Sequence, residues 1–295
     1  MLGVRRPQWL QRVCDAMDVI APLRLKESWD NVGLLVDPPM LGDAPGPYNI
    51  LLTNDLTEKV AMEALRKKAN AIVSYHPTPF RKSNRFDRSD VTARIVLALA
   101  KHDVAVYSPH VCLDCAVGGI NDWILQAFGI TSSLPITVRP VDADGTGIGR
   151  KAALPTEMTV KEAVEKVKAH FKLSHVRVGA PISAMPEEPG STPAFVNHVG
   201  DNLKVLSVAC CAGSGADVLR GCKEDLLVTG EMSHHEVLAH THEGRTVILT
   251  DHSNCERGYL PTLKSKLEEQ FSAQGCGGEY NVFVTEVDAD PLLVW

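Results

Sequence analysis

The sequence predicts an α/β protein whose sheets are largely parallel and covered by helices. Short β-branched, apolar runs alternate with helical patterns along the 295 residues, as in repeated strand–helix units. The strand-like runs are apolar at successive positions, which is typical of strands buried on both faces. Apolar residues make up 44% and charged residues 22% of the chain, so it has material for a sizeable core. These values exclude disordered, collagen-like and coiled-coil chains.

Seven segments have the composition of buried strands. Each is short, apolar and rich in β-branched residues, and several end in a polar cluster. They are Ile50–Asn54, Ala71–Ser74, Val104–Ser108, Lys204–Cys210, Leu226–Thr229, Arg245–Thr250 and Asn281–Val287.

Eight segments lie between or beside these strands and carry helical patterns. Apolar residues recur in them at the spacing of one helix face. They are Pro7–Ile20, Lys59–Lys68, Val91–Lys101, Asn121–Phe128, Thr159–Phe171, Ala216–Lys223, His234–His242 and Leu260–Gln274. Ser183–Thr192 is rich in Pro, Ser, Gly and acid and is expected to be an exposed loop, and Val141–Gly149 is a candidate boundary.

Charge and hydropathy exclude several classes of protein. The net charge is -6, from 30 Lys and Arg against 36 Asp and Glu, so no strong basic field is available for direct nucleic-acid binding. No segment reaches the roughly 18 consecutive apolar residues of a membrane span. The N-terminus lacks the apolar run of a secretory signal. We therefore expect a cytoplasmic protein, with the nucleus as the alternative, whose eight cysteines are mostly buried free thiols.

Three predicted strands each end in a cluster that contains a histidine. These clusters include His76, His110 and His252, and carboxylates follow four residues after two of them, at Asp114 and Glu256. Residues four apart share one face of a helical turn, and ligands gather beyond the carboxyl ends of strands in open α/β sheets. Imidazole with carboxylate suits Zn²⁺, Mn²⁺ or Fe²⁺. The alternative is a set of solvated histidines, with Asp114 as a helix cap and Glu256 as a first-turn carboxylate.

Three further motifs are weaker signals. Cys112 and Cys115 form a CxxC pair, but a structural zinc site usually needs a second pair. The turn Ala212–Ala216 is rich in glycine yet matches no nucleotide-binding fingerprint, which favours a close strand-to-helix turn. His234 and His235 begin a predicted helix, and since neighbours on a helix point about 100° apart, at most one would reach a shared centre.

Several segments together resemble the NGG-one-interacting-factor-three family, also known as the GTP cyclohydrolase one type two family. The matching segments span most of the chain, and the stretch Trp29–Leu34 together with the ordered His, Asp and His-x₃-Glu set is fairly specific. They are Glu27–Leu34, Thr53–Thr57, Ser74–Pro77, Tyr107–His110 with Leu113–Asp114, Gly119–Trp123, Cys211–Ala216, Thr229–Glu231 with His234–His235, and His252–Glu256.

The resemblance implies two interlocked α/β lobes with a dinuclear metal site in the cleft between them. We expect lobe one to comprise residues 1–130 plus 245–295 and to carry most ligands, and lobe two to comprise 131–244. The resemblance also implies a toroidal homohexamer, in the compact form of the family without an inserted domain. The family's metal ligands map to His76, Asp114, His252 and Glu256.

One position departs from the family pattern. Many members have two consecutive histidines where this chain has Tyr75 and His76. One ligand of one metal is therefore missing, and three outcomes are open: weaker binding of the second ion, a water in that position, or recruitment of His110.

Two functions from different classes fit these residues. The first is a metal-dependent hydrolase acting on a nucleotide-like or other anionic small molecule, with two divalent ions (Zn, Mn or Fe) activating a bridging water. Asp114 or Glu256 would bridge the ions, and His110 or His235 would act as general base or orient the substrate. The second is a non-catalytic metal-binding regulatory or scaffold protein with transcription-related protein partners. Carboxylate-rich ligands leave room for water and favour catalysis.

Overall fold

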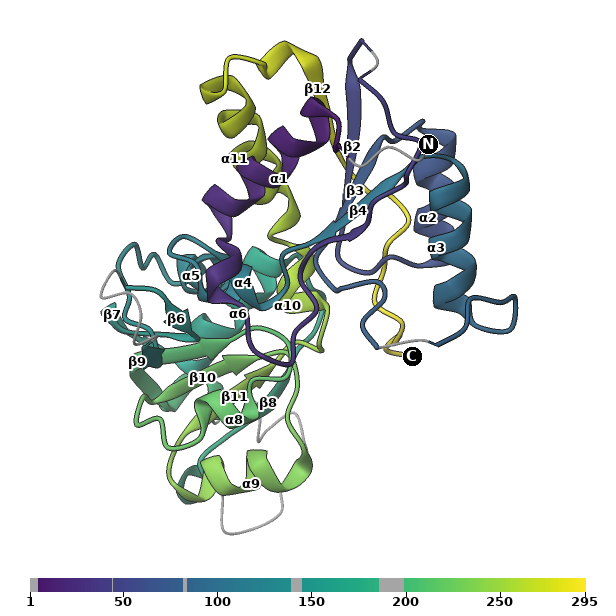
Figure 1. Ribbon diagram of the computed structural model, residues 1–295. Coiled ribbons are helices and arrows are strands. Elements are labelled where there is room, and N and C mark those ends of the chain that lie inside the picture. The colour runs from purple at the N-terminus through teal and green to yellow at the C-terminus, as the bar shows by residue number, and fades with distance from the viewer. Residues whose placement is uncertain (1–4, 44, 82–83, 139–144, 186–198) are drawn as a thin grey trace. The chain divides into compact units, whose positions relative to one another are not determined.

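The computed structural model describes residues 5–43, 45–81, 84–138, 145–185 and 199–295. The chain divides into two compact units (Figure 1). Unit one contains residues 1–113 and 259–295, and unit two contains residues 114–258. Unit two is therefore inserted into unit one along the sequence.

Unit one is built on a five-stranded sheet in the order β1-β4-β3-β2-β12. Strands β2, β3, β4 and β12 run parallel, and β1 is antiparallel at one edge. Figure 1 shows α2 and α3 on one side of this sheet and α1 and α11 on the other. The strands are β1 (Gly33–Val36), β2 (Tyr48–Thr53), β3 (Ala71–Ser74), β4 (Ala105–Ser108) and β12 (Tyr280–Val284), and the helices are α1 (Gln8–Ile20), α2 (Glu58–Arg66), α3 (Val91–Lys101) and α11 (Leu260–Ala273).

The core of unit one explains why these runs form strands and helices. Leu51 of β2, Ile72 of β3 and Val106 of β4 pack in one cluster with buried residues of α2 and α3. Local capping defines where both helices begin. The Thr57 hydroxyl accepts a hydrogen bond from the Val60 N–H, and the Asp90 carboxylate accepts one from the Ala93 N–H, which satisfies donors that a helix leaves open.

Unit two contains a second five-stranded sheet in the order β7-β9-β10-β11-β8. The three central strands are parallel, and the edge strands β7 and β8 are antiparallel to their neighbours. Capping boxes at Thr159 and Ser233 start α6 and α9. The strands are β7 (Arg150–Thr159), β8 (Arg177–Gly179), β9 (Lys204–Cys211), β10 (Leu226–Thr229) and β11 (Thr246–Leu249), with a small separate pair β5 (Thr137–Val138) and β6 (Gly147–Ile148). The helices are α5 (Ile120–Gln126), α6 (Val160–Phe171), α8 (Ala216–Leu219), α9 (His234–His242) and α10 (Asn254–Arg257). Helix α4 (Val111–Cys115) spans the point in the sequence where unit one gives way to unit two.

The predicted α/β class with mixed, partly parallel sheets is confirmed. Every expected strand and helix is present, although α8 ends at Leu219, earlier than expected. Strand β7 was not predicted, because it is an edge strand with exposed positions, Pro155 in its middle and an irregular register between Ala153 and Met158. The expected loop Ser183–Thr192 and the candidate boundary Val141–Gly149 lie partly outside the described residues.

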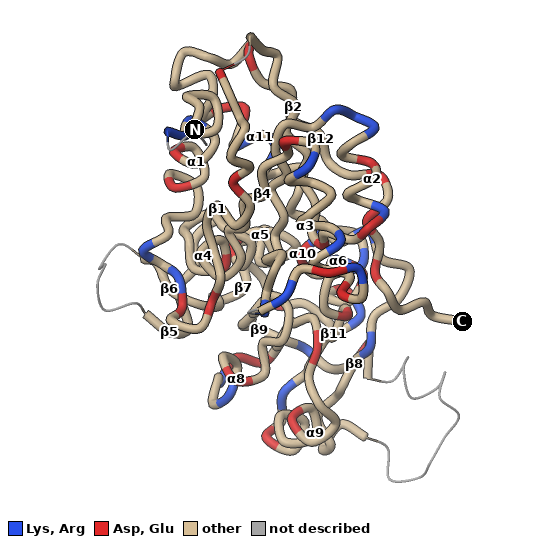
Figure 2. Tube along the Cα trace, turned by 45° about the vertical axis from the view of Figure 1, so that its right-hand side comes forward, with Lys and Arg blue, Asp and Glu red and all other residues tan. Residues whose placement is uncertain are grey.

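Charged residues are distributed over the whole trace. Figure 2 shows Lys and Arg interspersed with Asp and Glu in both units. Within the described ranges, no helix has the length and apolar character needed to cross a membrane.

Candidate metal centre

The parallel strands of unit one deliver polar side chains to one edge of their sheet. Asn54 and Asp55 follow β2, Tyr75 and His76 follow β3, and His110 follows β4 after Pro109. Because the carboxyl ends of parallel strands meet at the same edge, residues far apart in the sequence become neighbours. The rings of His76 and His110 lie 5.5 Å apart between centroids.

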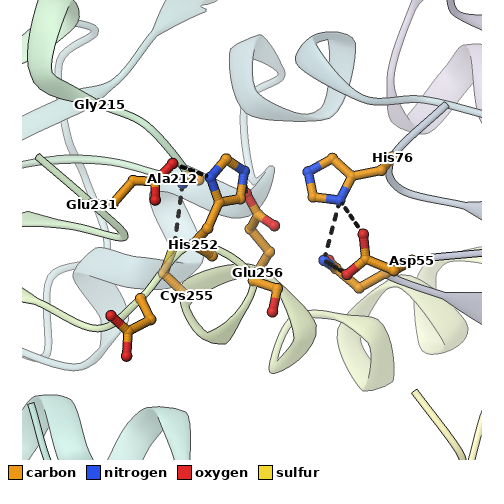
Figure 3. A network of polar contacts seen from close by, with 12 residues as sticks. Asp55, His76, Ala212, Gly215, Glu231, His252, Cys255 and Glu256 are labelled. Carbon is orange, nitrogen blue, oxygen red and sulfur yellow. Dashed lines mark hydrogen bonds and ion pairs between the residues drawn. The ribbon is translucent and has the colours of Figure 1, made fainter. Parts of the chain in front are cut away.

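His76 is oriented by a carboxylate. Its Nδ1 lies 2.8 Å from Oδ1 of Asp55, and Asn54 Nδ2 lies 3.5 Å from the same nitrogen (Figure 3). A carboxylate partner on Nδ1 fixes the orientation and tautomer of the ring, as it does in metal-ligating histidines. The side chain of His76 is 23% exposed, so the ring is held but remains reachable. The role of Asp55 was not predicted from the sequence.

His110 has the same arrangement with a different carboxylate. Its Nδ1 lies 2.7 Å from Oδ1 of Asp30, whose side chain is completely buried. The second oxygen of Asp30 accepts a hydrogen bond from the N–H of Val111, the next residue after His110. His110 itself has φ +34°, a backbone conformation that is rare for non-glycine residues. The pairing therefore orders both the ring and the local backbone, and Asp30 is a second partner that sequence analysis missed.

Tyr75 is buried beside both rings. It is 3% exposed, and its ring centroid lies 5.0 Å from that of His76 and 5.6 Å from that of His110. The Ser108 hydroxyl donates to the Tyr75 carbonyl at 2.8 Å, which joins the ends of β3 and β4.

In unit two, His252 lies between two acidic residues. It follows β11, and its Nδ1 lies 2.8 Å from Oε1 of Glu231, which follows β10 (Figure 3). Its Nε2 lies 3.5 Å from Oε1 of Glu256 on α10, whose side chain is 1% exposed. A carboxylate-oriented imidazole thus presents its second nitrogen beside a buried carboxylate, and these two donor types together suit Zn²⁺, Mn²⁺ or Fe²⁺.

The glycine-rich turn after β9 packs directly against this pair. A methyl group on Gly213, which has φ +62°, would lie 2.7 Å from Oε1 of Glu256 and 3.0 Å from Nε2 of His252. The Gly213 N–H donates to Sγ of Cys255, and its carbonyl accepts from the N–H of Glu231. The turn therefore needs glycine because the backbone itself forms one wall of the ligand pair.

Asp114 is joined to the same turn through Asn121. Asp114 is 7% exposed on α4, and its carbonyl accepts a hydrogen bond from Asn121 Nδ2 at 3.0 Å. Asn121 Oδ1 in turn accepts from the N–H of Ala212 at 2.8 Å. The amide of Asn121 thus links the helix that carries Asp114 to the glycine-rich turn.

The nearby thiols are held in the neutral form. Burial raises the pKa of Cys211 and Cys255 well above the ordinary value, and the negative charge of Asp114 adds to both shifts. All eight cysteines are free, and Cys112 and Cys115 are buried. A neutral thiol is a poorer metal ligand than a thiolate, so burial disfavours these cysteines as donors relative to imidazole and carboxylate.

His235, the second predicted general base, is exposed in the first turn of α9. Its ring contacts that of His234, with centroids 5.3 Å apart. Among the described residues this is the one ring or polar side-chain contact that His235 makes. His110 has an orienting carboxylate, whereas His235 has none in the described part of the chain.

A family model, Duf34/NIF3 (NGG1p interacting factor 3), matches residues 9–291. The chain belongs to the Duf34/NIF3 family. It is 41% identical over 291 residues to NIF3-like protein 1 of Drosophila melanogaster, covering 97% of this chain and 89% of the relative. It is 36% identical over 281 residues to NGG1-interacting factor 3 of Saccharomyces cerevisiae, covering 91% and 90%.

Solved structures support the NIF3 fold. The crystal structure of a Bacillus cereus protein related to NIF3 superposes with a TM-score of 0.78 at 18% identity, covering 97% of this chain and 98% of the other. Together with the family match, this confirms the predicted resemblance and fold class. His76, His252 and Glu256 are candidate metal ligands of this NIF3 chain by donor type.

Proposed function

We propose that this NIF3-family protein is a metal-dependent hydrolase that acts on a nucleotide-like or other anionic small molecule. The observation that carries the proposal is the shared orientation of three histidines. In His76, His110 and His252 alike, a carboxylate lies at Nδ1 at 2.7–2.8 Å, and Nε2 is the nitrogen that we assign to the metal or the proton. Hydrogen bonds of this kind raise the basicity of metal-ligating histidines and fix their tautomer.

His76, Asp114, His252 and Glu256 are the proposed ligands of two divalent cations. When bound, a pair of such cations supplies an activated water and neutralises developing negative charge. The donor set supports this, since two imidazoles and two carboxylates leave room for water and substrate. Zn²⁺, Mn²⁺ and Fe²⁺ all accept these donors.

His110 is the proposed general base. Nε2 would accept the proton, and the buried Asp30 carboxylate at Nδ1 would stabilise the resulting imidazolium. His235 lacks such a partner among the described residues and is proposed only to orient the substrate. The family resemblance implies two consecutive histidines where this chain has Tyr75 and His76. Only His76 of that pair is available as a ligand here, so the second cation is expected to be held more weakly.

Metal analysis combined with a substrate screen tests the proposal. Metal content is measured in the parent protein, in His252→Ala and in His242→Ala, a control that removes an exposed histidine at the end of α9. We expect metal loss in His252→Ala alone. The metal-loaded parent is then screened against nucleotides, phosphoesters and cyclic amides. Unchanged metal content in His252→Ala would refute the ligand assignment.

The second candidate function is a metal-binding regulatory protein. It is favoured by one observation, the name of the yeast relative, which is an NGG1-interacting factor. Full metal loading with no turnover across the panel would favour this function, with transcription-related protein partners in the cytoplasm or nucleus. A homohexamer is proposed under either function, and light scattering of the purified chain tests it.

A further inference from the structure

Two large aromatic side chains lie exposed beside His110 in unit one. Trp29 is 62% and Phe80 is 53% exposed. Trp29 precedes the buried Asp30, and Phe80 lies in the segment that follows β3 and His76. Aromatic rings of this size are usually covered in a folded protein because they bury the most apolar area. Two of them exposed beside a candidate general base are available to a ligand at that site.

Both rings lie close to the imidazole at steep angles. The centroids of Trp29 and Phe80 each lie 6.0 Å from that of His110, at interplanar angles of 80° and 86°. The two rings lie 6.4 Å apart at 68° to each other. Neither ring is in a parallel stack with the other or with His110, and more than half of each side chain is exposed to solvent. A planar ligand can stack on such a face, and stacking of this kind discriminates little between one aromatic ring and another.

The backbone under both rings is fixed. Asn31 Nδ2 donates to the carbonyl of Pro79 at 2.6 Å, which ties the segment of Trp29 to that of Phe80. The N–H of Asn31 donates to Oδ1 of Asp30, the oxygen that also contacts His110. The exposed rings and the Asp30–His110 pair therefore form one connected assembly. An assembly that is ordered before binding reduces the entropy lost when a ligand binds.

The segment that carries Phe80 is also basic. Arg81 follows Phe80, and Arg85 and Arg88 lie further along the same segment, all three exposed. Positive side chains close in sequence to exposed aromatic rings favour a ligand with an aromatic ring and a negative group. The net charge of -6 opposes an extended polyanion, so a small anionic molecule fits better than a nucleic acid.

We propose that Trp29 and Phe80 form a subsite that binds the planar heteroaromatic ring of a small phosphorylated substrate beside His110. The basic residue Arg81 attracts the phosphate. This inference deepens the proposed function, on which it rests, by assigning a ring-binding role to residues that hold no metal. The ring is recognised by stacking, so purine and pyrimidine rings are both accepted, while a phosphorylated sugar without a ring system is bound poorly.

Tryptophan emission provides a direct readout of the subsite. Trp9 and Trp123 are buried, at 3% and 6% exposed, whereas Trp295 is fully exposed. In a Trp295→Phe background, Trp29 is therefore the exposed tryptophan. The full-length protein, with the metal it retains on purification, is titrated with a purine nucleoside monophosphate and with ribose 5-phosphate. We expect a saturable change in emission with the nucleotide and at least tenfold weaker binding of ribose 5-phosphate.

Two matched variants test the assignment by calorimetry. Phe80→Ala should weaken nucleotide binding by about tenfold, the size of one aromatic stack. Phe86→Ala removes an equally exposed phenylalanine, 57% exposed, from the same segment and should leave binding unchanged. Both side chains are exposed, so both variants are expected to fold.

Several results would overturn the subsite. They are equal binding of ribose 5-phosphate and the nucleotide, or equal nucleotide affinity in Phe80→Ala and the parent. A change of oligomeric mass in Phe80→Ala with unchanged nucleotide affinity would also overturn it, by assigning the rings to a contact between copies. Nucleotide binding that depends on Phe80 without any hydrolysis would refute the hydrolase and leave the subsite standing.

Discussion

The buried amide of Asn121 donates a hydrogen bond to the main-chain carbonyl of Asp114 at 3.0 Å. The same amide accepts the Ala212 N–H, so one side chain serves both the Asp114 helix and the glycine-rich turn. Asn121 is completely buried. The position of Asp114, a proposed ligand, is therefore supported by a residue outside the proposed ligand set.

Replacing Asn121 by alanine should weaken both stability and metal binding. The change leaves a buried carbonyl and a buried N–H unpaired, at a cost of about 1–3 kcal/mol for each group. Urea unfolding measures the stability, and metal titration of the folded variant measures the site. Asn281→Ala is the control, because Asn281 is exposed on β12 and its side chain bonds the side chain of Asn49 at the surface. Equal metal affinity in Asn121→Ala and the parent would contradict the link to Asp114.

Replacing Glu231 by glutamine should lower metal affinity with little effect on folding. Glutamine keeps the size of the side chain but loses the charge that orients His252 through Nδ1. Removal of such an orienting carboxylate typically costs 10–100-fold in metal affinity or activity. The matched control is Glu268→Gln on α11, whose carboxylate pairs at the surface with Lys264. A competition titration against a metal chelator gives the affinities. Identical metal affinities for Glu231→Gln and Glu268→Gln would contradict the orienting role of Glu231.

Gly213→Ala should abolish metal binding in addition to lowering the stability of the fold. The new methyl group would meet Glu256 and His252 at 2.7 Å and 3.0 Å, and the residue has φ +62°. A left-handed conformation costs a non-glycine residue about 1–2 kcal/mol. Gly221→Ala is the control for that strain, because Gly221 has φ +81° with no atom near its added methyl group. Both variants should lose stability in thermal unfolding, and only Gly213→Ala should lose metal.

Acid should destabilise unit one partly through Glu63. Burial raises the pKa of this carboxyl, but hydrogen bonds from Thr285, Lys67 and the Glu286 N–H together lower it below its ordinary value of 4.5. A carboxyl with a depressed pKa contributes stability above the unfolded pKa, and that stability is lost as pH falls through the folded pKa. Glu63→Gln should therefore be less stable than the parent at pH 7, and the difference should shrink below about pH 4.5.

Urea midpoints measured between pH 3 and pH 7 test this dependence. Glu58→Gln is the control, because Glu58 bonds Arg94 with its side chain 54% exposed and surface ion pairs contribute little. Parallel loss of stability in the parent and Glu63→Gln on acidification would contradict the role of Glu63.

The fold was predictable where the pattern is uniform. Strands such as Ala71–Ser74 and Leu226–Thr229 are buried at every position, so their composition alone identifies them. The edge strands β1, β7 and β8 were missed because they are short or partly exposed and carry no such run. Pairing with a neighbour, rather than local sequence, defines these strands.

The candidate ligands could be proposed from the sequence, whereas the pairing of their histidines with orienting carboxylates could not. Histidines at strand ends can be found from the sequence alone, because the apolar strands before them can be recognised there. Asp30 and His110 are 80 residues apart, and Asp55 and His76 are 21 apart, so their pairing follows from sheet order and turn geometry. Asp55 is the second residue after β2, and Glu231 is the second residue after β10. Both could have been found by the same strand-end argument.

The pairing of β12 with β2 has a consequence for how the chain is made. Tyr48 lies opposite Tyr280 in this parallel pair, and all of unit two lies between them in the sequence. During synthesis the ribosome releases β2 long before β12, so the edge of β2 stays unpaired while unit two emerges. Late closure of so long a loop slows folding and exposes an edge to aggregation. A chain that stops before β12 would keep that edge open permanently, which makes premature termination more harmful here than its few missing residues would indicate.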